Sequence, residues 1–495
     1  MAGIQRGSFM NHRHVLLAFA VVLVGWMHGM PVFAQQEATK LRQLSLENKP
    51  RKGDFDQMLE RRVIRVLVPY SRTFYFIDKG QERGITADLV RDFERYINKK
   101  YAKQLGKRPL TVFLIVTTRQ KALSGVAEGL GDIAAGNFTA TEERSKIVDM
   151  IAPTDQKHVQ ELIVTGPASQ QVGTLDDLAG KTVHVRKASS YYESLLALNK
   201  RLQKEGKAPV KITELPDELE DEDALEMLNA GLFGLMVVDD WKARMWAQIL
   251  PKVKVREDLV LRAEGYTGWA IRKESPKLRE VLMDFYRNSV RKQSTWLQVQ
   301  HHKRIKQIGN NTSGEEQKRF EAMLKLFEKY GAKYNFDPLM LAAQGYQESR
   351  LNQQVRSRAG AIGVMQIMPA TGKALQVGNI RELEPNIHAG AKYMDQILTR
   401  YFPDAKFSEA ERSFFAMAAY NAGPANIARM RKLAVERGLD PDKWFNNVEI
   451  VASERIGAET TTYVRNIYKY YVAYKLSQQA QHAARRRSEN KTSER

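Results

Sequence analysis

The strongest candidate for chemistry in this sequence is one glutamate in a predicted helix. Asp337-Pro338 predicts the start of that helix, because aspartate is a favoured N-cap and proline fits the first helical position. Leu341, Gly345 and Glu348 then lie on one face, since residues three or four positions apart stack in a helix. Gly345 removes a side chain one turn before Glu348, so we expect a bulky substrate to approach the carboxylate there. The alternative is that Glu348 is an ordinary solvated residue on the surface of the helix.

The segment after this helix is small and turn-prone at residues 359–363 and becomes apolar at residues 364–365. We expect it to line the floor of a groove and to offer backbone N–H groups to sugar hydroxyl and acetamide groups. It also belongs to a larger pattern of four ordered motifs that resembles the soluble-lytic-transglycosylase family. The motifs are Glu348-Ser349-Arg350-Leu351-Asn352 with Ser357, Ala359-Gly360-Ala361, Gly363-Val364-Met365-Gln366 and Pro369-Ala370-Thr371; Pro385 to Tyr393; Ala419 to Pro424; and Glu459-Thr460 with Tyr463-Val464.

The resemblance implies a mostly helical, lysozyme-like domain that cleaves peptidoglycan. The bond would be the one between N-acetylmuramic acid and N-acetylglucosamine, and the product would carry a 1,6-anhydro end. Many glycosidases need two carboxylates, but no Asp or Glu lies between Ser349 and Gln366. We therefore expect Glu348 to act alone, as acid towards the glycosidic oxygen and then as base towards the C6 hydroxyl. No cofactor and no metal is expected.

The same resemblance implies substrate contacts around Glu348. Ser349 and Asn421 would position the substrate, and Gln366 would contact it through its amide. An apolar lining would raise the pKa of Glu348 and keep it protonated near neutral pH; Met365, Tyr420 and Tyr463 are its candidates, with core packing as the alternative. The family pattern is broken at Gln353, where proline is frequent, and at Val364, where leucine is usual. The full expected substrate-binding set is Ser349, Gly363, Met365, Gln366, Tyr420, Asn421 and Tyr463.

Strand and helix patterns alternate in the N-terminal half, which predicts an α/β fold with helices on the faces of a parallel or mixed sheet. A helix is expected over residues 89–97, with Asp88 as its N-cap. The pattern restarts near residue 178, and a strand at 267–271 is expected to return to the first unit. Two lobes with a ligand cleft between them are therefore predicted. The predicted strands are 63–68, 111–116, 133–135, 182–185, 235–238 and 267–271.

Short motifs in this half, in order, resemble the family 3 solute-binding domain of amino-acid uptake. The motifs are Val66 to Pro69, Gly84 to Leu89, Gly131 to Ala135, Thr139 to Arg144, Leu178 to Lys181 and Val237 to Asp240. The resemblance implies that Arg144 clamps a ligand carboxylate and that Asp240, or Asp239, holds its amino group, with Thr139 beside them. A surface arginine and a helix-capping aspartate are the alternatives. The expected ligand is an amino acid or a wall-derived peptide that regulates the second domain.

The formal net charge is +20 and the chain has no cysteine. No zinc-finger, RRM or basic-zipper pattern is present, so nucleic-acid binding is not expected. The charge suits a peripheral place among anionic envelope polymers. Without cysteine, a disulfide, a thiolate zinc site and a cysteine nucleophile are excluded. The acidic run 217–223 is interpreted as the N-terminal end of a helix from Ala224, and His301-His302 as surface, rather than as metal sites.

The N-terminus has the pattern of a signal peptide, with an apolar run at about 15–26 and small residues before a cut after Ala34. The run is short for a membrane span, so we expect export to the periplasm and a peripheral place at the outer membrane; an uncleaved anchor is the alternative. The expected organisation is signal peptide 1–34, linker 35–56, two-lobed solute-binding-like domain 57–305 with its second lobe at about 157–260, linker 306–316, transglycosylase domain 317–478 and basic disordered tail 479–495.

Three functions stay open at this point. The first is a lytic transglycosylase that an N-terminal domain regulates. The second is a sensor that grips glycan without turning it over, and the third is a hydrolytic lysozyme. The intact Glu348 and the Tyr420-Asn421 motif favour the enzyme over the sensor.

Overall fold

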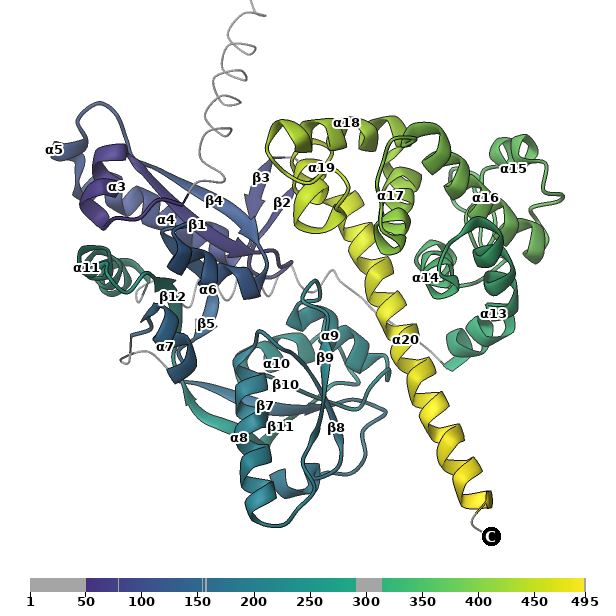
Figure 1. Ribbon diagram of the computed structural model, residues 1–495, viewed down its shortest axis with the longest axis horizontal. Helices are drawn as coiled ribbons and strands as arrows, with labels where there is room; N and C mark the ends of the chain where they lie inside the picture. The colour runs from purple at the N-terminus through teal and green to yellow at the C-terminus, as the bar shows by residue number, and fades with distance from the viewer. Residues whose placement is uncertain (1–49, 79, 154, 156–157, 291–313, 494–495) are drawn as a thin grey trace, which may run out of the picture.

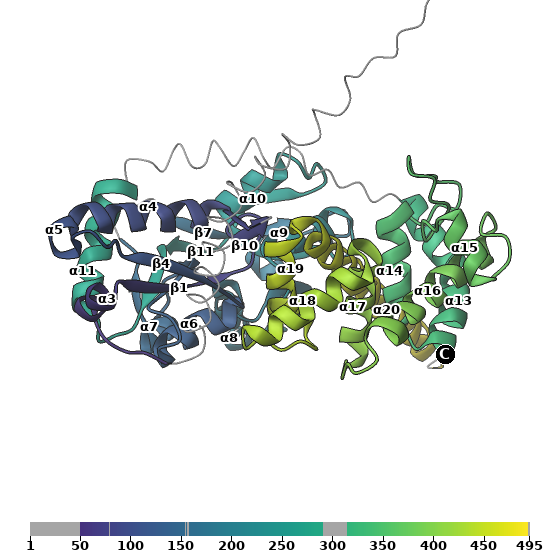
Figure 2. The same cartoon turned by 90° about the horizontal axis from the view of Figure 1, so that it is seen from above.

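The computed structural model describes residues 50–493, with gaps at 79, 154, 156–157 and 291–313. The predicted signal peptide, residues 35–49 of the first linker and His301-His302 lie outside the described residues. Two α/β lobes stand beside a helical domain (Figure 1). Seen from above, the lobes occupy one end of the molecule and the helical domain the other (Figure 2).

The first lobe is built on a five-stranded sheet in the order β4-β1-β5-β12-β6. β1 (Val63–Pro69) runs parallel to β4 (Thr111–Thr117) and β5 (Ile133–Thr139). β12 (Thr267–Ile271) adds antiparallel to β5 and to β6 (Asp149–Ile151), so the chain returns to the first sheet as predicted. The other elements of this lobe are α3 (Phe55–Arg61), β2 (Phe76–Asp78), β3 (Gln81–Arg83), α4 (Ile85–Lys100), α5 (Ala102–Leu105), α6 (Arg119–Glu128), α7 (Glu142–Ile147), α11 (Pro276–Phe285) and η2 (Tyr286–Val290).

The second lobe has its own five-stranded sheet, in the order β11-β7-β10-β8-β9. β8 (Thr182–Arg186) runs parallel to β10 (Leu235–Asp239) and to β9 (Lys211–Leu215). β7 (Val159–Thr165) is antiparallel to β10 and to β11 (Lys254–Gly265). The helices of this lobe are η1 (Leu175–Leu178), α8 (Ser190–Lys204), α9 (Asp221–Asn229) and α10 (Asp240–Ala247).

The helical domain surrounds one apolar core in which Phe327, Phe415 and Trp444 are fully buried. Helices α14 and α17 supply much of this core, because nearly every residue on the inner side of each is apolar or small. The elements are α13 (Gly314–Tyr334), α14 (Pro338–Ser349), α15 (Pro369–Leu375), α16 (Leu383–Tyr401), α17 (Glu409–Ala422), α18 (Pro424–Glu436), η3 (Trp444–Val448), α19 (Glu449–Arg455) and α20 (Ala458–Ser493).

The last helix, α20, runs along both the helical domain and the second lobe (Figure 1). Val464 and Ile467 are buried in the core of the helical domain, whereas Val472 and Ala473 belong to the core of the second lobe. The helix that closes the helical domain is therefore also part of the N-terminal domain.

Several predictions about elements are wrong. α3 begins at Phe55, inside the predicted first linker. The tail at 479–495 was expected to be disordered, but α20 continues to Ser493, because Ala, Gln and Arg favour helix and extending a formed helix needs no new nucleus. α13 begins at Gly314, inside the predicted second linker. α4 begins at Ile85 after Gly84, so Asp88 lies in the first turn and is not the N-cap.

The acidic run likewise starts its helix earlier than predicted. α9 begins at Asp221, with Glu220 as N-cap and Asp223 completing a capping box, so the helix does not wait for Ala224. Among the described residues, no helix is both long enough and apolar enough to cross a membrane.

Candidate active site

Glu348 lies in the last turn of α14. The Asp337 side chain accepts a hydrogen bond from the backbone N–H of Leu339 at 2.8 Å, and Pro338 is the first helical residue, as predicted. Arg350 ends the helix in the left-handed region at φ 58°. The Glu348 carboxylate is therefore held at a helix end rather than on a free surface.

The role predicted for Gly345 is wrong. A Cβ at this position would approach Val364 Cγ1 to 2.9 Å and Met365 Sδ to 3.4 Å. The missing side chain lets the segment at 364–365 pack directly onto α14, so it opens no path for a substrate.

Tyr463, on α20, contacts Glu348, the candidate catalytic residue. Its hydroxyl donates a hydrogen bond to Glu348 Oε1 at 2.5 Å. Burial raises the pKa of Glu348, and the bond from Tyr463 opposes that rise by stabilising the charged form. In the part of the chain that the structure describes, no other carboxylate contributes to this pKa. Glu348 therefore has a raised pKa, one donor on Oε1, and Oε2 left for a substrate.

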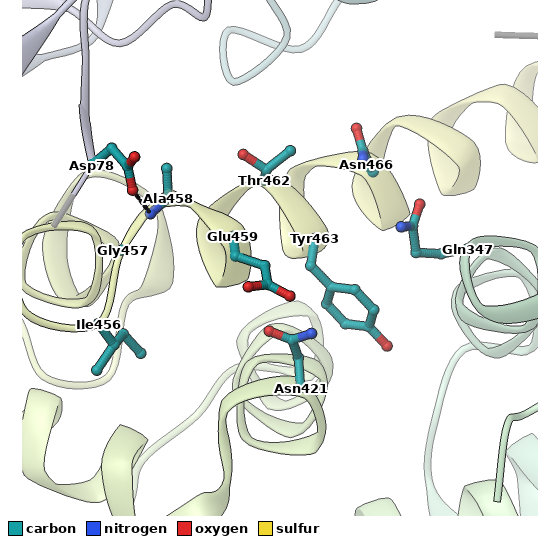
Figure 3. A pocket seen from close by; sticks show the side chains of 10 residues that line it. All are labelled: Asp78, Gln347, Asn421, Ile456, Gly457, Ala458, Glu459, Thr462, Tyr463 and Asn466. Carbon is teal, nitrogen blue, oxygen red and sulfur yellow. Dashed lines mark hydrogen bonds between the residues drawn. The ribbon is translucent and has the colours of Figure 1, made fainter. Parts of the chain in front are cut away.

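A cavity of about 550 Å³ opens beside Tyr463, and Glu348 itself is not among the residues that line it. Figure 3 shows Tyr463 and Asn421 facing each other across it, with Gln347, the neighbour of Glu348, on a third side. The lining contains two carboxylates, those of Asp78 and Glu459, and no basic side chain. The lining residues are Asp78, Gln347, Asn421, Ile456, Gly457, Ala458, Glu459, Thr462, Tyr463 and Asn466.

Asn421 and Tyr420 sit at the end of α17. Asn421 Oδ1 accepts a hydrogen bond from the Thr460 hydroxyl at 2.8 Å, which fixes the amide at the cavity. The Tyr420 hydroxyl donates to the backbone carbonyl of Met365 at 2.7 Å. Burial raises the pKa of Tyr420, and the nearby charge of Glu348 raises it further. Both tyrosines of the predicted set therefore lie around Glu348.

Tyr420 and the other predicted substrate residues, Ser349, Gly363, Met365 and Gln366, do not line this cavity. The Ser349 hydroxyl donates to the backbone carbonyl of Val364 at 2.9 Å and is buried. Met365 is fully buried, and a Cβ at Gly363 would collide with the Asn386 amide at 2.6 Å. The Gln366 amide donates to the Gly363 carbonyl at 2.9 Å. These contacts pack the segment after α14 against that helix, on which Glu348 lies.

The second predicted site lies between the two lobes. Thr139, Arg144 and Asp239 line a cavity there with a remaining volume of about 10 Å³. Arg144 donates to the backbone carbonyls of Thr139 at 2.8 Å and Ala188 at 2.9 Å. Asp240 points elsewhere, because it pairs with Arg244 at 2.6 Å. Of the two aspartates named from the sequence, only Asp239 faces the cleft.

The charges of the cleft are largely satisfied by the protein itself. Lys242 Nζ lies 2.7 Å from Asp221, 2.9 Å from Asp239 and 3.1 Å from the Tyr191 hydroxyl. The rings of Phe74 and Trp241 flank the same ammonium at 5.5 and 5.6 Å. An ammonium therefore already occupies the acidic side of the cleft.

Glu220 and Asp221 of the acidic run complete this network. Arg186 pairs with Glu220 at 3.1 Å and with Asp221 at 2.5 Å, and Arg119 of the first lobe reaches Glu220 at 3.2 Å. Burial alone would raise the pKa of Asp221, but Arg186 and Lys242 hold it well below its usual range. Sequence reasoning missed these basic partners, since each comes from a different element; only Lys242, one turn after Asp239, gave a local signal.

Comparison with known proteins divides the chain in the same way. The family model for bacterial extracellular solute-binding proteins, family 3, matches residues 64–317, and the transglycosylase SLT domain matches residues 325–441. Tyr463 lies beyond the second match.

The chain is similar to proteins named membrane-bound lytic murein transglycosylase F. The one from Pseudomonas fluorescens strain Pf-5 is 28% identical, over 84% of this chain and 85% of that protein. The one from Ectopseudomonas mendocina strain ymp is 27% identical, over 86% of each.

Among solved structures, an amino acid ABC transporter substrate-binding protein from Streptococcus pneumoniae bound to L-arginine aligns with 50% of this chain and 98% of its own, at 18% identity and a TM-score of 0.41. The family 3 model covers half of the chain, and the SLT match contains Glu348. The chain therefore belongs to the family 3 bacterial extracellular solute-binding proteins and carries a transglycosylase SLT domain after that region.

Proposed function

We propose that the protein is a lytic transglycosylase that cleaves the β-1,4 bond between N-acetylmuramic acid and N-acetylglucosamine in peptidoglycan. The observation that carries this proposal is the pairing of Glu348 with Tyr463 beside a cavity large enough for a sugar residue. The SLT match and the names of the relatives support the same activity. The relatives' names also favour a place in the cell envelope, and export to the periplasm with peripheral attachment at the outer membrane fits the N-terminal pattern.

In the proposed reaction Glu348 first acts as an acid. Burial favours the protonated form of Glu348, and Oε1 accepts from Tyr463, so we assign the proton to Oε2, from which it passes to the glycosidic oxygen. The N-acetyl group of the substrate supports the developing cation at C1. The Glu348 carboxylate then takes the proton of the C6 hydroxyl, whose oxygen attacks C1 and closes the anhydro ring. Water does not enter the products, and the carboxyl group ends protonated.

A single carboxylate suffices for this sequence of steps. A second catalytic carboxylate about 5 Å away would raise the pKa of Glu348 by repulsion, and no such contribution is present among the described residues. This disfavours a retaining hydrolase, whose second carboxylate lies this close, and in our proposal Glu348 takes both roles.

The test is clearance of purified peptidoglycan by the wild type and by Glu348→Gln. Loss of the proton donor should lower the rate about 10²- to 10⁴-fold. The matched control is Glu411→Gln, because burial also raises the pKa of Glu411, to about 7, although this carboxyl lies in another part of the same domain and not at the cavity. Clearance by Glu348→Gln at the wild-type rate would refute the proposal.

We further infer that the interlobe cleft binds an amino acid or a wall-derived peptide that regulates the enzyme. Asp239 supports this proposal, because its Oδ1 is buried at the cleft without a hydrogen-bond partner, and the ion pair of Arg144 with Glu193 is long, at 3.8 Å. Calorimetry with amino acids and muropeptides should detect binding to the wild type and none to Arg144→Ala. Absence of binding of every such ligand to the wild type would exclude this role.

A further inference from the structure

The helix that carries Tyr463 lacks a capping side chain of its own. α20 begins at Ala458, directly after Gly457, whose φ of +102° is reached readily only by glycine. The first N–H groups of a helix have no partner within the helix, and glycine has no side chain to satisfy them. Something else must accept from the first turn of α20.

That acceptor comes from the first lobe. Asp78, the last residue of β2, accepts a hydrogen bond from the backbone N–H of Ala458 at 3.1 Å on Oδ1. The neighbouring Ile77 carbonyl accepts from the Ser453 hydroxyl at 2.5 Å, so the β2–β3 hairpin is bound to the corner between α19 and α20. A carboxylate at this place also complements the positive end of the helix dipole.

The capped turn holds two contacts of the active site. The Thr460 hydroxyl fixes Asn421, and Tyr463 donates to Glu348 little more than one turn after the cap. Asp78 also lines the cavity itself, beside the start of α20 (Figure 3). Movement of the first turn of α20 would therefore displace both of these side chains at once.

We propose that Asp78 is a positioning residue of the lytic reaction, supplied by the solute-binding-like domain. Its carboxylate caps α20 and so holds Tyr463 against Glu348, and it forms one wall of the substrate cavity. The first lobe thus supplies one residue of the cavity wall and one contact that orders α20, whatever ligand the interlobe cleft binds. This inference rests on the proposed transglycosylase activity.

The test measures peptidoglycan cleavage by the purified protein across a range of pH for the wild type, Asp78→Ala and Asp78→Asn. Asp78→Ala should lower kcat roughly tenfold, the effect expected when a helix cap is lost. It should also shift the alkaline limb of the profile to higher pH, because Glu348 loses the donor that lowers its pKa. Asn accepts the same hydrogen bond, so Asp78→Asn should restore most of the rate and the wild-type profile.

The matched control is Asp54→Ala. Asp54 is the N-cap of α3 in the same lobe and has hydrogen bonds only within that lobe. This variant should lose thermal stability while its kcat and pH profile stay unchanged. A wild-type rate and profile in Asp78→Ala, an equal loss in Asp54→Ala, or no rescue by Asp78→Asn would each overturn the proposal. A wild type without lytic activity would instead refute the proposed function.

Discussion

The two candidate sites of this chain differ in the partners of their buried carboxylates. The cavity beside Tyr463 is open, at about 550 Å³, and the neighbouring Glu348 carboxylate accepts a hydrogen bond from the Tyr463 hydroxyl. The interlobe cleft is nearly filled, at about 10 Å³, and Asp221 there lies against Arg186 and Lys242. The pKa of Glu348 is accordingly raised, and that of Asp221 is held low.

This difference separates a reactive carboxylate from a structural one. Among the described residues Glu348 has no basic partner that would hold it ionised, and burial favours its protonated form. Asp221 is fixed as an anion by Arg186 and Lys242 of its own lobe, so it cannot donate a proton. A ligand that enters the cleft must compete with Lys242 for Asp239, whereas a glycan entering the cavity displaces no ion pair.

The largest expected effect is a loss of protein stability when the interlobe cleft loses a buried charge. Lys242→Met keeps the length of the side chain but leaves Asp221 and Asp239 without their shared ammonium. Breaking a buried ion pair in this way should cost about 3–5 kcal/mol in the free energy of unfolding, as measured by urea denaturation. In the control, Lys329→Met removes an exposed partner of Glu384 and should change little. Equal stabilities of the two variants would mean that the cleft is not held by this lysine.

The next largest effect is on catalysis beside the cavity that Tyr463 lines. Tyr463→Phe removes one hydrogen bond to a charged group, so kcat should fall roughly ten- to a hundredfold. Because that bond lowers the pKa of Glu348, its loss raises the pKa, and activity should persist to higher pH. A pH–rate profile for both proteins measures this shift. A profile that moves to lower pH, or an unchanged rate, would contradict the assigned geometry.

The smallest effect tests a third carboxylate, Glu222, which bridges the lobes by accepting from the Ser71 hydroxyl at 2.8 Å. Burial, with Asp223 and Glu220 nearby, raises its pKa to about 7. A raised folded-state pKa stabilises the protein below the unfolded value of 4.5, and this stability is lost as the pH rises through about 7.

Glu222→Gln should therefore be more stable than the wild type above pH 7, on the order of 1 kcal/mol. Thermal unfolding at several pH values measures the difference. Parallel curves for the two proteins between pH 4 and pH 8 would show that Glu222 does not titrate in this range.

Local patterns predicted the parts of the molecule that are set by short-range physics. The Asp337-Pro338 helix start and the strand at 267–271 were found in the sequence, because capping and buried apolar runs leave a local signal. The bond from Ala458 to Asp78 joins residues 380 positions apart, and no periodicity marks it. Arg186 and Lys242 were missed for the same reason, since ion-pair partners are chosen by the fold. The role of Gly345 was wrongly predicted, because the sequence does not show that Val364 fills the space next to this glycine.

The most direct test of the central claim is the mass of the products released from purified peptidoglycan. With Glu348 as the only acid and base, the freed muramic acid ends should be 1,6-anhydro and one water lighter than the products of hydrolysis. Hydrated ends from the wild type, lost in Glu348→Gln, would contradict this mechanism and identify the cavity as that of a hydrolase. Asp78 and Glu459 would then be the carboxylates to examine as its base.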